Sequence, residues 1–274
     1  MTRRLAVAAL IALLPTVGLA GSIEQPEIPY IGPPLVAAPT PDLIFTVRGG
    51  ISAAPTYFGS DTYEVGPDFS LGFQFLRLPG GRTVGSQDPN NVRYGFAPRG
   101  SLRIVSERST SESPELAGLN DIDLSVELGM GLGYTQRNFE AFGVARYGVV
   151  GHESWVGEFG ADVIARPSDR LTLTAGPRLF LGDDTYSATY FGVTAAESAA
   201  SGGSFAAFAA TGGALSAGFE VGMTYALNDN WGLSGALRYD RLLGDAADSP
   251  ITAQGSADQF SVRLGLVRKI TFDF

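Results

Sequence analysis

Residues 260–274 read FSVRLGLVRKITFDF, and apolar side chains alternate with polar or small ones along the whole stretch. The even positions carry the apolar face, broken once by an arginine: Phe260, Val262, Leu264, Leu266, Arg268, Ile270, Phe272 and Phe274. A period of two predicts a β-strand with one apolar face. The strand is longer than usual for a globular protein, and charge on its other face is typical of a transmembrane β-barrel. An edge strand of a soluble sheet is the alternative.

Further alternating runs follow one another from residue 43 onward. We identify ten, at 43–51, 66–76, 92–105, 121–135, 138–150, 153–166, 169–181, 213–227, 231–243 and 258–274. In the run 121–135 large apolar side chains occupy one face, and glycines and charges the other. The large side chains would overfill the interior of a soluble barrel, so we expect them to face lipid. The sequence predicts an all-β fold, a transmembrane antiparallel up-and-down β-barrel of about ten strands over residues 43–274.

The connections between these runs alternate in length. Tight turns are predicted at 136–137, 167–169 and 228–230, and longer loops at 52–65, 106–120, 182–212 and 244–257. Short periplasmic turns and long outer loops are the outer-membrane pattern. The stretch 77–91 is long for a periplasmic turn, and extra strands there or within 182–212 keep a count of twelve open.

The N-terminal region carries a targeting pattern. Arg3 and Arg4 precede an apolar core, and small residues up to Ala20 offer a cleavage site, so residues 1–20 are predicted to be a signal peptide. Residues 21–42 are dense in proline, which blocks helix and ladder alike. We expect this segment to be an extended periplasmic tail.

Composition narrows the chemistry. The chain of 274 residues has no cysteine, one histidine and a formal net charge of −9. The missing cysteines exclude disulfides and thiolate metal sites. An acidic chain is a poor partner for nucleic acid. We expect no cofactor, no metal and no catalytic residue, with outer-membrane lipid and lipopolysaccharide as the surroundings.

Several short stretches, in order along the chain, resemble the MipA/OmpV family of outer-membrane proteins. They are Pro55-Thr56-Tyr57-Phe58-Gly59-Ser60, Leu116-Ala117-Gly118-Leu119, Tyr190-Phe191-Gly192-Val193, Gly212-Gly213 and Asp248-Ser249-Pro250-Ile251. The resemblance covers residues 43–274 and implies a barrel in the outer membrane of a Gram-negative cell. For some members it also implies a scaffolding role that links a murein hydrolase, a lytic transglycosylase, to a murein synthase.

The C-terminal strand carries two further expectations. It closes on Phe272 and Phe274, and such an ending resembles the segment by which bacterial outer-membrane proteins are recognised by the barrel assembly machinery. Arg268 is discordant because the alternation points it at lipid, where it would snorkel towards an interface.

Charged residues on the predicted lumen faces suggest an alternating belt. Opposite residues of an antiparallel pair have numbers with a constant sum. The predicted turns therefore place Glu127 opposite Arg146, Arg146 opposite Glu158, and Glu158 opposite Arg178. A chosen register across the longer loop adds Arg99 opposite Glu127, and the turn 228–230 places Glu220 opposite Arg238. We expect a structural belt that closes the barrel at mid-height, made of Arg99, Glu127, Arg146, Glu158, Arg178, Glu220 and Arg238.

Three functions stay open on these grounds. The first is a structural or scaffolding barrel tied to peptidoglycan machinery, and the second is a narrow channel for small solutes. The third is a rim hydrolase, because His152, Glu153 and Ser154 lie at an outer hairpin tip and Asp183 and Asp184 begin the next outer loop. Adjacency in sequence does not make a catalytic triad, so we expect the protein not to be an enzyme.

Overall fold

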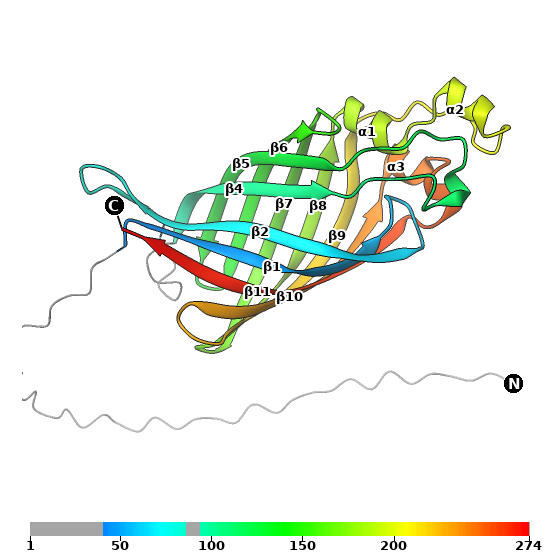
Figure 1. Cartoon of the computed structure of the whole chain (residues 1–274). Coiled ribbons are helices and arrows are strands. Elements are labelled where there is room, and N and C mark those ends of the chain that lie inside the picture. Colours follow the sequence, from blue (N-terminus) through cyan, green and yellow to red (C-terminus); the bar gives the residue numbers. More distant parts are fainter. Residues whose placement is uncertain (1–40, 86–93, 274) are drawn as a thin grey trace, which may run out of the picture. The chain divides into compact units, whose positions relative to one another are not determined.

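A computed structural model of the chain describes residues 41–85 and 94–273. The predicted signal peptide, the tail up to residue 40, residues 86–93 of the predicted connection 77–91 and of the predicted run 92–105, and Phe274 lie outside this part. One antiparallel sheet of eleven strands dominates the fold (Figure 1). Its strands are β1 (Leu43–Pro55), β2 (Tyr63–Arg77), β3 (Thr83–Gly85), β4 (Gly95–Val105), β5 (Ser125–Gln136), β6 (Phe139–Val150), β7 (Trp155–Ser168), β8 (Leu171–Gly182), β9 (Gly213–Ala226), β10 (Trp231–Leu242) and β11 (Asp258–Phe272).

The strand order is that of an up-and-down meander. From β4 to β11 each strand pairs with its neighbour in the sequence, and β11 then pairs with β1, which pairs with β2 and so with β3. The predicted all-β antiparallel fold is therefore confirmed, with ten long strands and the short β3. No ladder joins β2 to β4 within the described ranges, so these strands lie near the two edges of the sheet.

The sheet curls so strongly that side chains of distant strands meet on its inner side. Arg238 on β10 reaches Glu158 on β7 although two strands separate them, and Arg103 on β4 lies over Phe180 on β8. The outer side is apolar and exposed, as at Met130 and Leu264. Inward charge and outward apolar surface are the two faces that the alternation predicts.

Helical loops gather at one end of the sheet, which we call the outer end. They are η1 (Pro114–Leu116), α1 (Asp184–Phe191), α2 (Ala195–Ala200), α3 (Gly244–Asp248) and η2 (Thr252–Gln254). Figure 1 shows α1 and α3 where β8 and β10 end. None of the helices in the described residues is long and apolar enough to cross a membrane.

The strand boundaries follow the predicted runs closely, and the main differences lie in the connections. β1 and β2 extend further towards each other than expected and leave a loop of residues 56–62. The long connection 77–91 contains β3, which pairs with the end of β2. The connection 182–212 contains α1 and α2 rather than strands, because side-chain caps at Asp183 and Thr194 begin the two helices.

Candidate functional site

A continuous chain of ion pairs crosses the inner side of the barrel. Glu127 accepts from Arg103 (Nη1–Oε1 3.2 Å) and from Arg146 (Nε–Oε2 2.8 Å). Arg146 also binds Glu158 (Nη1–Oε2 3.0 Å), and Glu158 binds Arg238 (Oε1–Nη1 2.7 Å). These residues come from β4, β5, β6, β7 and β10, so the network ties together strands on different sides of the barrel.

A second network of ion pairs lies on β7, β8, β9 and β11. Arg178 on β8 binds Asp162 on β7 (Nη2–Oδ1 2.9 Å) and Glu220 on β9 (Nη2–Oε1 3.2 Å). Glu220 is also paired with Arg263 on β11. Asp162 and Arg178 are buried, so each charge is held by its partner rather than by bulk water.

The inner charges of the described strands are balanced. Further pairs join Arg48 to Asp68 (2.8 Å), Arg238 to Asp240 (2.6 Å), and Arg99 to Glu140. Together the pairs involve seven arginines and seven carboxylates: Arg48, Arg99, Arg103, Arg146, Arg178, Arg238 and Arg263, with Asp68, Glu127, Glu140, Glu158, Asp162, Glu220 and Asp240. An interior filled by matched pairs presents no field of one sign to steer a charged solute.

The register differs from the expected one by two residues at several strand pairs. Glu127 lies opposite Gly148 rather than Arg146, and Glu158 lies opposite Val144 rather than Arg146. A turn displaced by one residue changes the register by two: the turn between β5 and β6 lies later than expected, and the turn between β6 and β7 lies earlier. Such a shift leaves every side chain on its predicted face. Arg146 therefore stays a diagonal neighbour of both carboxylates, within reach of its long side chain.

The expected juxtaposition of Arg99 and Glu127 is wrong. Arg99 lies opposite Gly131, and Arg103 is the residue opposite Glu127. Arg99 pairs instead with Glu140, two strands away on β6. The loop 106–120 is too long to set a register, so the choice rested on matching charges and was wrong by four residues.

The expected juxtaposition of Glu158 and Arg178 is also wrong. Glu158 lies opposite Phe180, and Arg178 lies opposite Gly160. Arg178 turns to Asp162, whereas Glu158 binds across the barrel to Arg238. The turn between β7 and β8 is tighter than predicted, with a bulge after Ala165, and this displaces the ladder.

Between β9 and β10 the observed register is the expected one, with Glu220 opposite Arg238. These two residues nevertheless pair with others: Glu220 binds Arg178 and Arg263, and Arg238 binds Glu158 and Asp240. In a curled sheet the nearest opposite charge can lie across the interior rather than on the next strand. The register between neighbouring strands gives no information about such contacts across the interior.

Sequence reasoning missed several members of these networks. The register chosen across the loop 106–120 would also set Arg103 opposite Asp123, and the expected belt contains none of Arg103, Asp162, Asp240 and Arg263. All four lie on predicted strands, and Arg103, Asp162 and Asp240 share a face by alternation with the expected belt residues Arg99, Glu158 and Arg238. The sequence signal that identifies these residues is therefore a charged side chain at an inward-facing strand position, whatever the register between the strands.

The one histidine belongs to this interior and not to an open rim site. The His152 Nδ1 atom lies 2.6 Å from Ser154 Oγ, and its Nε2 atom lies 3.4 Å from Glu127 Oε1. The His152 ring packs edge-on against Tyr186, with ring centroids 5.0 Å apart. Ser154 is 2% exposed and the His152 side chain 0%, so these contacts hold the hairpin tip in place and keep both side chains away from solvent.

An aromatic plug from the outer loops covers the charged interior. Tyr186 and Tyr190 on α1 face inward, with ring centroids 4.6 Å apart. Phe58, from the loop after β1, packs edge-on against Tyr190 at 5.2 Å, and Phe180 packs against Tyr186 at 5.5 Å. Arg103 lies 4.7 Å from the centre of the Phe180 ring, so the plug and the first ion-pair network touch.

Arg108 fastens the loop after β4 to this plug. Its guanidinium donates to the carbonyls of Tyr190 and Asn120, both at 3.2 Å. Burial lowers the pKa of Arg108, with Glu197 acting in the opposite sense. Glu197 in turn accepts from the Asn120 N–H (2.9 Å) and the Thr194 N–H (2.8 Å). The outer loops are thus bound to one another by buried polar contacts.

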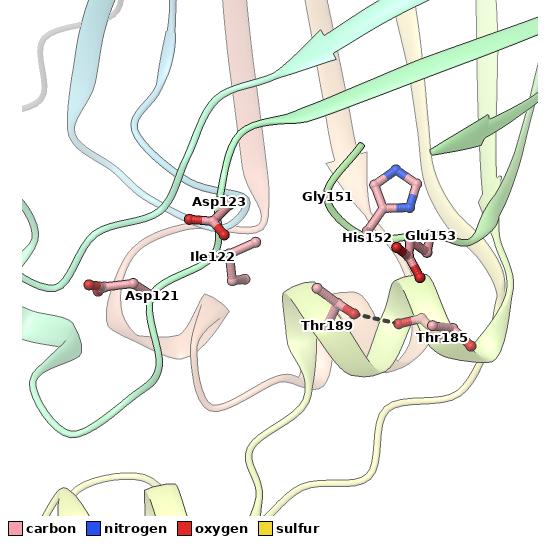
Figure 2. Close-up of a pocket in the computed structure, with 8 residues that line it drawn as sticks. All are labelled: Asp121, Ile122, Asp123, Gly151, His152, Glu153, Thr185 and Thr189. Carbon is pink, nitrogen blue, oxygen red and sulfur yellow. Dashed lines mark hydrogen bonds between the residues drawn. The ribbon is translucent and has the colours of Figure 1, made fainter. Parts of the chain in front are cut away.

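A pocket of about 410 Å³ opens at the outer end above His152 (Figure 2). Figure 2 shows Asp121 and Asp123 on one side of it, and Thr185 and Thr189 of α1 on the other. Asp121 is already engaged, because Thr110 donates to it through N–H (2.7 Å) and hydroxyl (3.0 Å). No group of three or more side chains placed to hold a metal ion occurs among the described residues.

Comparisons with known proteins place the chain among outer-membrane sequences. The family model described as MltA-interacting protein MipA matches residues 47–270. No curated protein sequence matches the chain.

Among solved structures, the Neisserial surface protein A aligns at 10% identity and a TM-score of 0.28, covering 83% of this chain and 97% of that one. Ail, the attachment invasion locus protein of Yersinia pestis, aligns at 10% identity and a TM-score of 0.26, covering 84% and 99%. The CymD monoaromatic hydrocarbon channel aligns at 8% identity and a TM-score of 0.30, covering 85% and 90%. Overlaps this loose carry no functional information.

Proposed function

The chain belongs to the family of the MltA-interacting protein MipA, and from that premise we propose that it is a closed scaffolding barrel of the outer membrane. Its task would be to hold murein-cleaving and murein-synthesising enzymes at the periplasmic face. The observation that carries this proposal is the interior, where paired charges and an aromatic plug occupy the path that a channel would need.

The closed interior supports a structural role over transport. Glu127 is fully buried between Arg103 and Arg146, and Tyr186 is fully buried above them. A solute would have to displace the plug and separate buried ion pairs, which is costly. Side chains nearly fill the interior of an eight-stranded barrel, and ten strands enclose only a slightly wider one, whereas large-pore porins use sixteen or more strands.

The partner surface that we propose lies at the end with tight turns. Arg137 ends the hairpin of β5 and β6, and Arg170 ends the hairpin of β7 and β8; both are exposed. Arg166 is exposed beside them and donates to the Arg137 carbonyl at 2.6 Å. A basic cluster on a chain of net charge −9 is suited to an acidic surface of a periplasmic protein.

Crosslinking in intact cells, followed by identification of the captured periplasmic proteins, tests the scaffolding role. Wild type should capture a murein hydrolase or synthase, and the double variant Arg137→Glu, Arg170→Glu should capture less. Arg241→Glu, at the outer end, is the matched control and should leave capture unchanged. Capture of neither class of enzyme by the wild-type protein would refute the scaffold.

Recording in planar bilayers tests the closed barrel separately. We expect no conductance of general-porin size, because the interior is occupied. Steady large openings of the purified wild-type protein would favour the narrow-channel alternative over a scaffold.

A further inference from the structure

A shallow groove lies on the outward face of the sheet, across β1, β10 and β11. Its volume is about 280 Å³, just below the roughly 300–1,000 Å³ of pockets that hold drug-sized ligands. The residues that line it are Val47, Gly49, Trp231, Leu266, Arg268 and Ile270. Five of the six are apolar, and the sixth is the arginine that interrupts the apolar face of β11.

Arg268 is a cation on a surface that otherwise faces lipid. It is exposed, and it lies opposite Val47 on one side and Trp231 on the other. Its guanidinium sits 4.8 Å from the centre of the Trp231 ring, and it has no ion pair with any residue in the described ranges. By contrast, the outward Arg241 is paired with Asp258 at 2.8 Å. A cation–π contact satisfies the face of a guanidinium but leaves its N–H edge free for an acceptor.

The groove lies at the edge of the membrane and not at its centre. Trp231 is the first residue of β10, directly after the turn at 228–230. Lys269, next to Arg268, donates its N–H to the carbonyl of Asn230 in that turn at 2.8 Å. Tryptophan is enriched where the lipid headgroups begin, so this edge is the level of the phosphates.

We propose that this groove binds a phospholipid of the periplasmic leaflet. Arg268 donates to the lipid phosphate, and the first part of one acyl chain lies along Val47, Leu266 and Ile270. The planar fork of arginine suits phosphate, and the bond is strong where water is sparse. Gly49 lies between Leu266 and Phe69 and has no side chain, so it leaves a gap in which the acyl chain lies.

The inference is independent of the scaffolding role, because it concerns the lipid-facing side of the barrel and not its periplasmic partners. The competing explanation is that Arg268 merely snorkels and is satisfied by Trp231 alone. In that case the groove would take up any apolar chain without regard to a phosphate.

Two variants separate these explanations, and each has a matched control. Arg268→Gln removes the charge, and its control is Arg241→Gln at the outer end. Gly49→Leu fills the groove, because a Cβ at Gly49 meets only the Phe69 ring, at an ordinary 3.6 Å. Its control is Gly100→Leu, on an outward position of β4 opposite the exposed Met130, where a Cβ meets no atom within 4 Å.

The test is native mass spectrometry of the purified, delipidated barrel titrated with phosphatidylglycerol, and with diacylglycerol of the same chains. Wild type should bind the phospholipid about tenfold more tightly than diacylglycerol, the factor expected for one charged hydrogen bond. Arg268→Gln should lose that preference, Gly49→Leu should weaken both lipids, and the two controls should match wild type.

Equal binding of the two lipids by wild type would overturn the proposal, as would unchanged phospholipid binding in Arg268→Gln. The comparison of lipids on the wild-type protein stands even where a variant does not insert. Arg268→Lys adds a further check, since it keeps the charge, loses the fork and should show an intermediate preference.

Discussion

Arg238 and Glu158 are joined across the barrel by an ion pair of 2.7 Å, although β9 and β8 lie between their strands. The same Glu158 carboxylate binds Arg146 on its other oxygen at 3.0 Å. One carboxylate thus connects β6, β7 and β10. Its position indicates that the inner charges stabilise the curl of the sheet.

Glu158→Ala should strongly destabilise the barrel. The change leaves Arg146 and Arg238 without their shared partner, and breaking a buried pair typically costs about 3–5 kcal/mol. Urea unfolding in lipid vesicles measures the difference in the free energy of unfolding. Glu112→Ala, in an exposed outer loop, is the control and should stay within about 0.5 kcal/mol of wild type. Equal unfolding midpoints for the two variants would contradict a structural belt.

Arg103 should matter more than Arg99, which reverses the order expected from sequence. Arg103 binds the fully buried Glu127 and packs over Phe180. Arg99 pairs with Glu140 and lies 4.1 Å from the centre of the Phe142 ring, but its side chain is 43% exposed to solvent. We expect Arg103→Ala to lower the unfolding midpoint clearly and Arg99→Ala to lower it slightly, because exposed pairs contribute about 0–1 kcal/mol. If Arg99→Ala lowered the unfolding midpoint more than Arg103→Ala in the same urea assay, the result would contradict the pairing of Arg103 with Glu127 and support the expected pairing of Arg99 with Glu127.

Loss of Phe274, or its replacement by Asp, should reduce the amount of assembled barrel more than loss of one ring explains. Heat-modifiable migration of membrane fractions measures the compact form. Phe45→Ala is the informative control, because it removes the stacking of Phe45 on Phe272, with centroids 5.8 Å apart, and leaves the C-terminus intact. We expect that variant to unfold more easily but to insert normally. Equal insertion of the two variants would argue against Phe272 and Phe274 as an assembly signal.

Acid should loosen the outer loop around α2. Burial alone would raise the pKa of Glu197, but the hydrogen bonds from Asn120 and Thr194 hold it below its usual value. A lowered folded-state pKa means that the stabilisation is present above about pH 4.3, the ordinary glutamate value, and is lost as pH falls through the folded-state value. Hydrogen exchange of residues 194–201 should therefore rise on acidification.

The variant Glu197→Gln provides the control for that experiment. It should exchange faster than wild type at pH 7, with a loss of about 1 kcal/mol in local stability, as for a missing helix cap. The difference between the two proteins should shrink in acid, since Glu197 is then protonated in both. If the difference in hydrogen exchange between wild type and Glu197→Gln were the same at all pH values, protonation of Glu197 would not be the cause of the acid effect.

The sequence by itself determined which face each strand residue occupies. Alternation assigned Glu127 and Arg146 inward and Leu264 and Met130 outward, and the structure agrees. The period of two makes this assignment robust, because an error of two residues in register changes the partner and keeps the face. The same reasoning exposed Arg268 as an outward charge before any contact was known.

Only the tertiary structure decided which charges meet. Besides the expected Arg146, Glu158 binds Arg238 rather than Arg178, and α1 in the connection 182–212 places Tyr186 over the interior. Turn lengths shift each ladder, and the curl of the sheet brings strands together that are distant in its order. A one-dimensional pattern specifies the side of the sheet on which a residue lies. The distance between two residues across the interior depends on how all the strands curl together, and no single stretch of sequence specifies that curl.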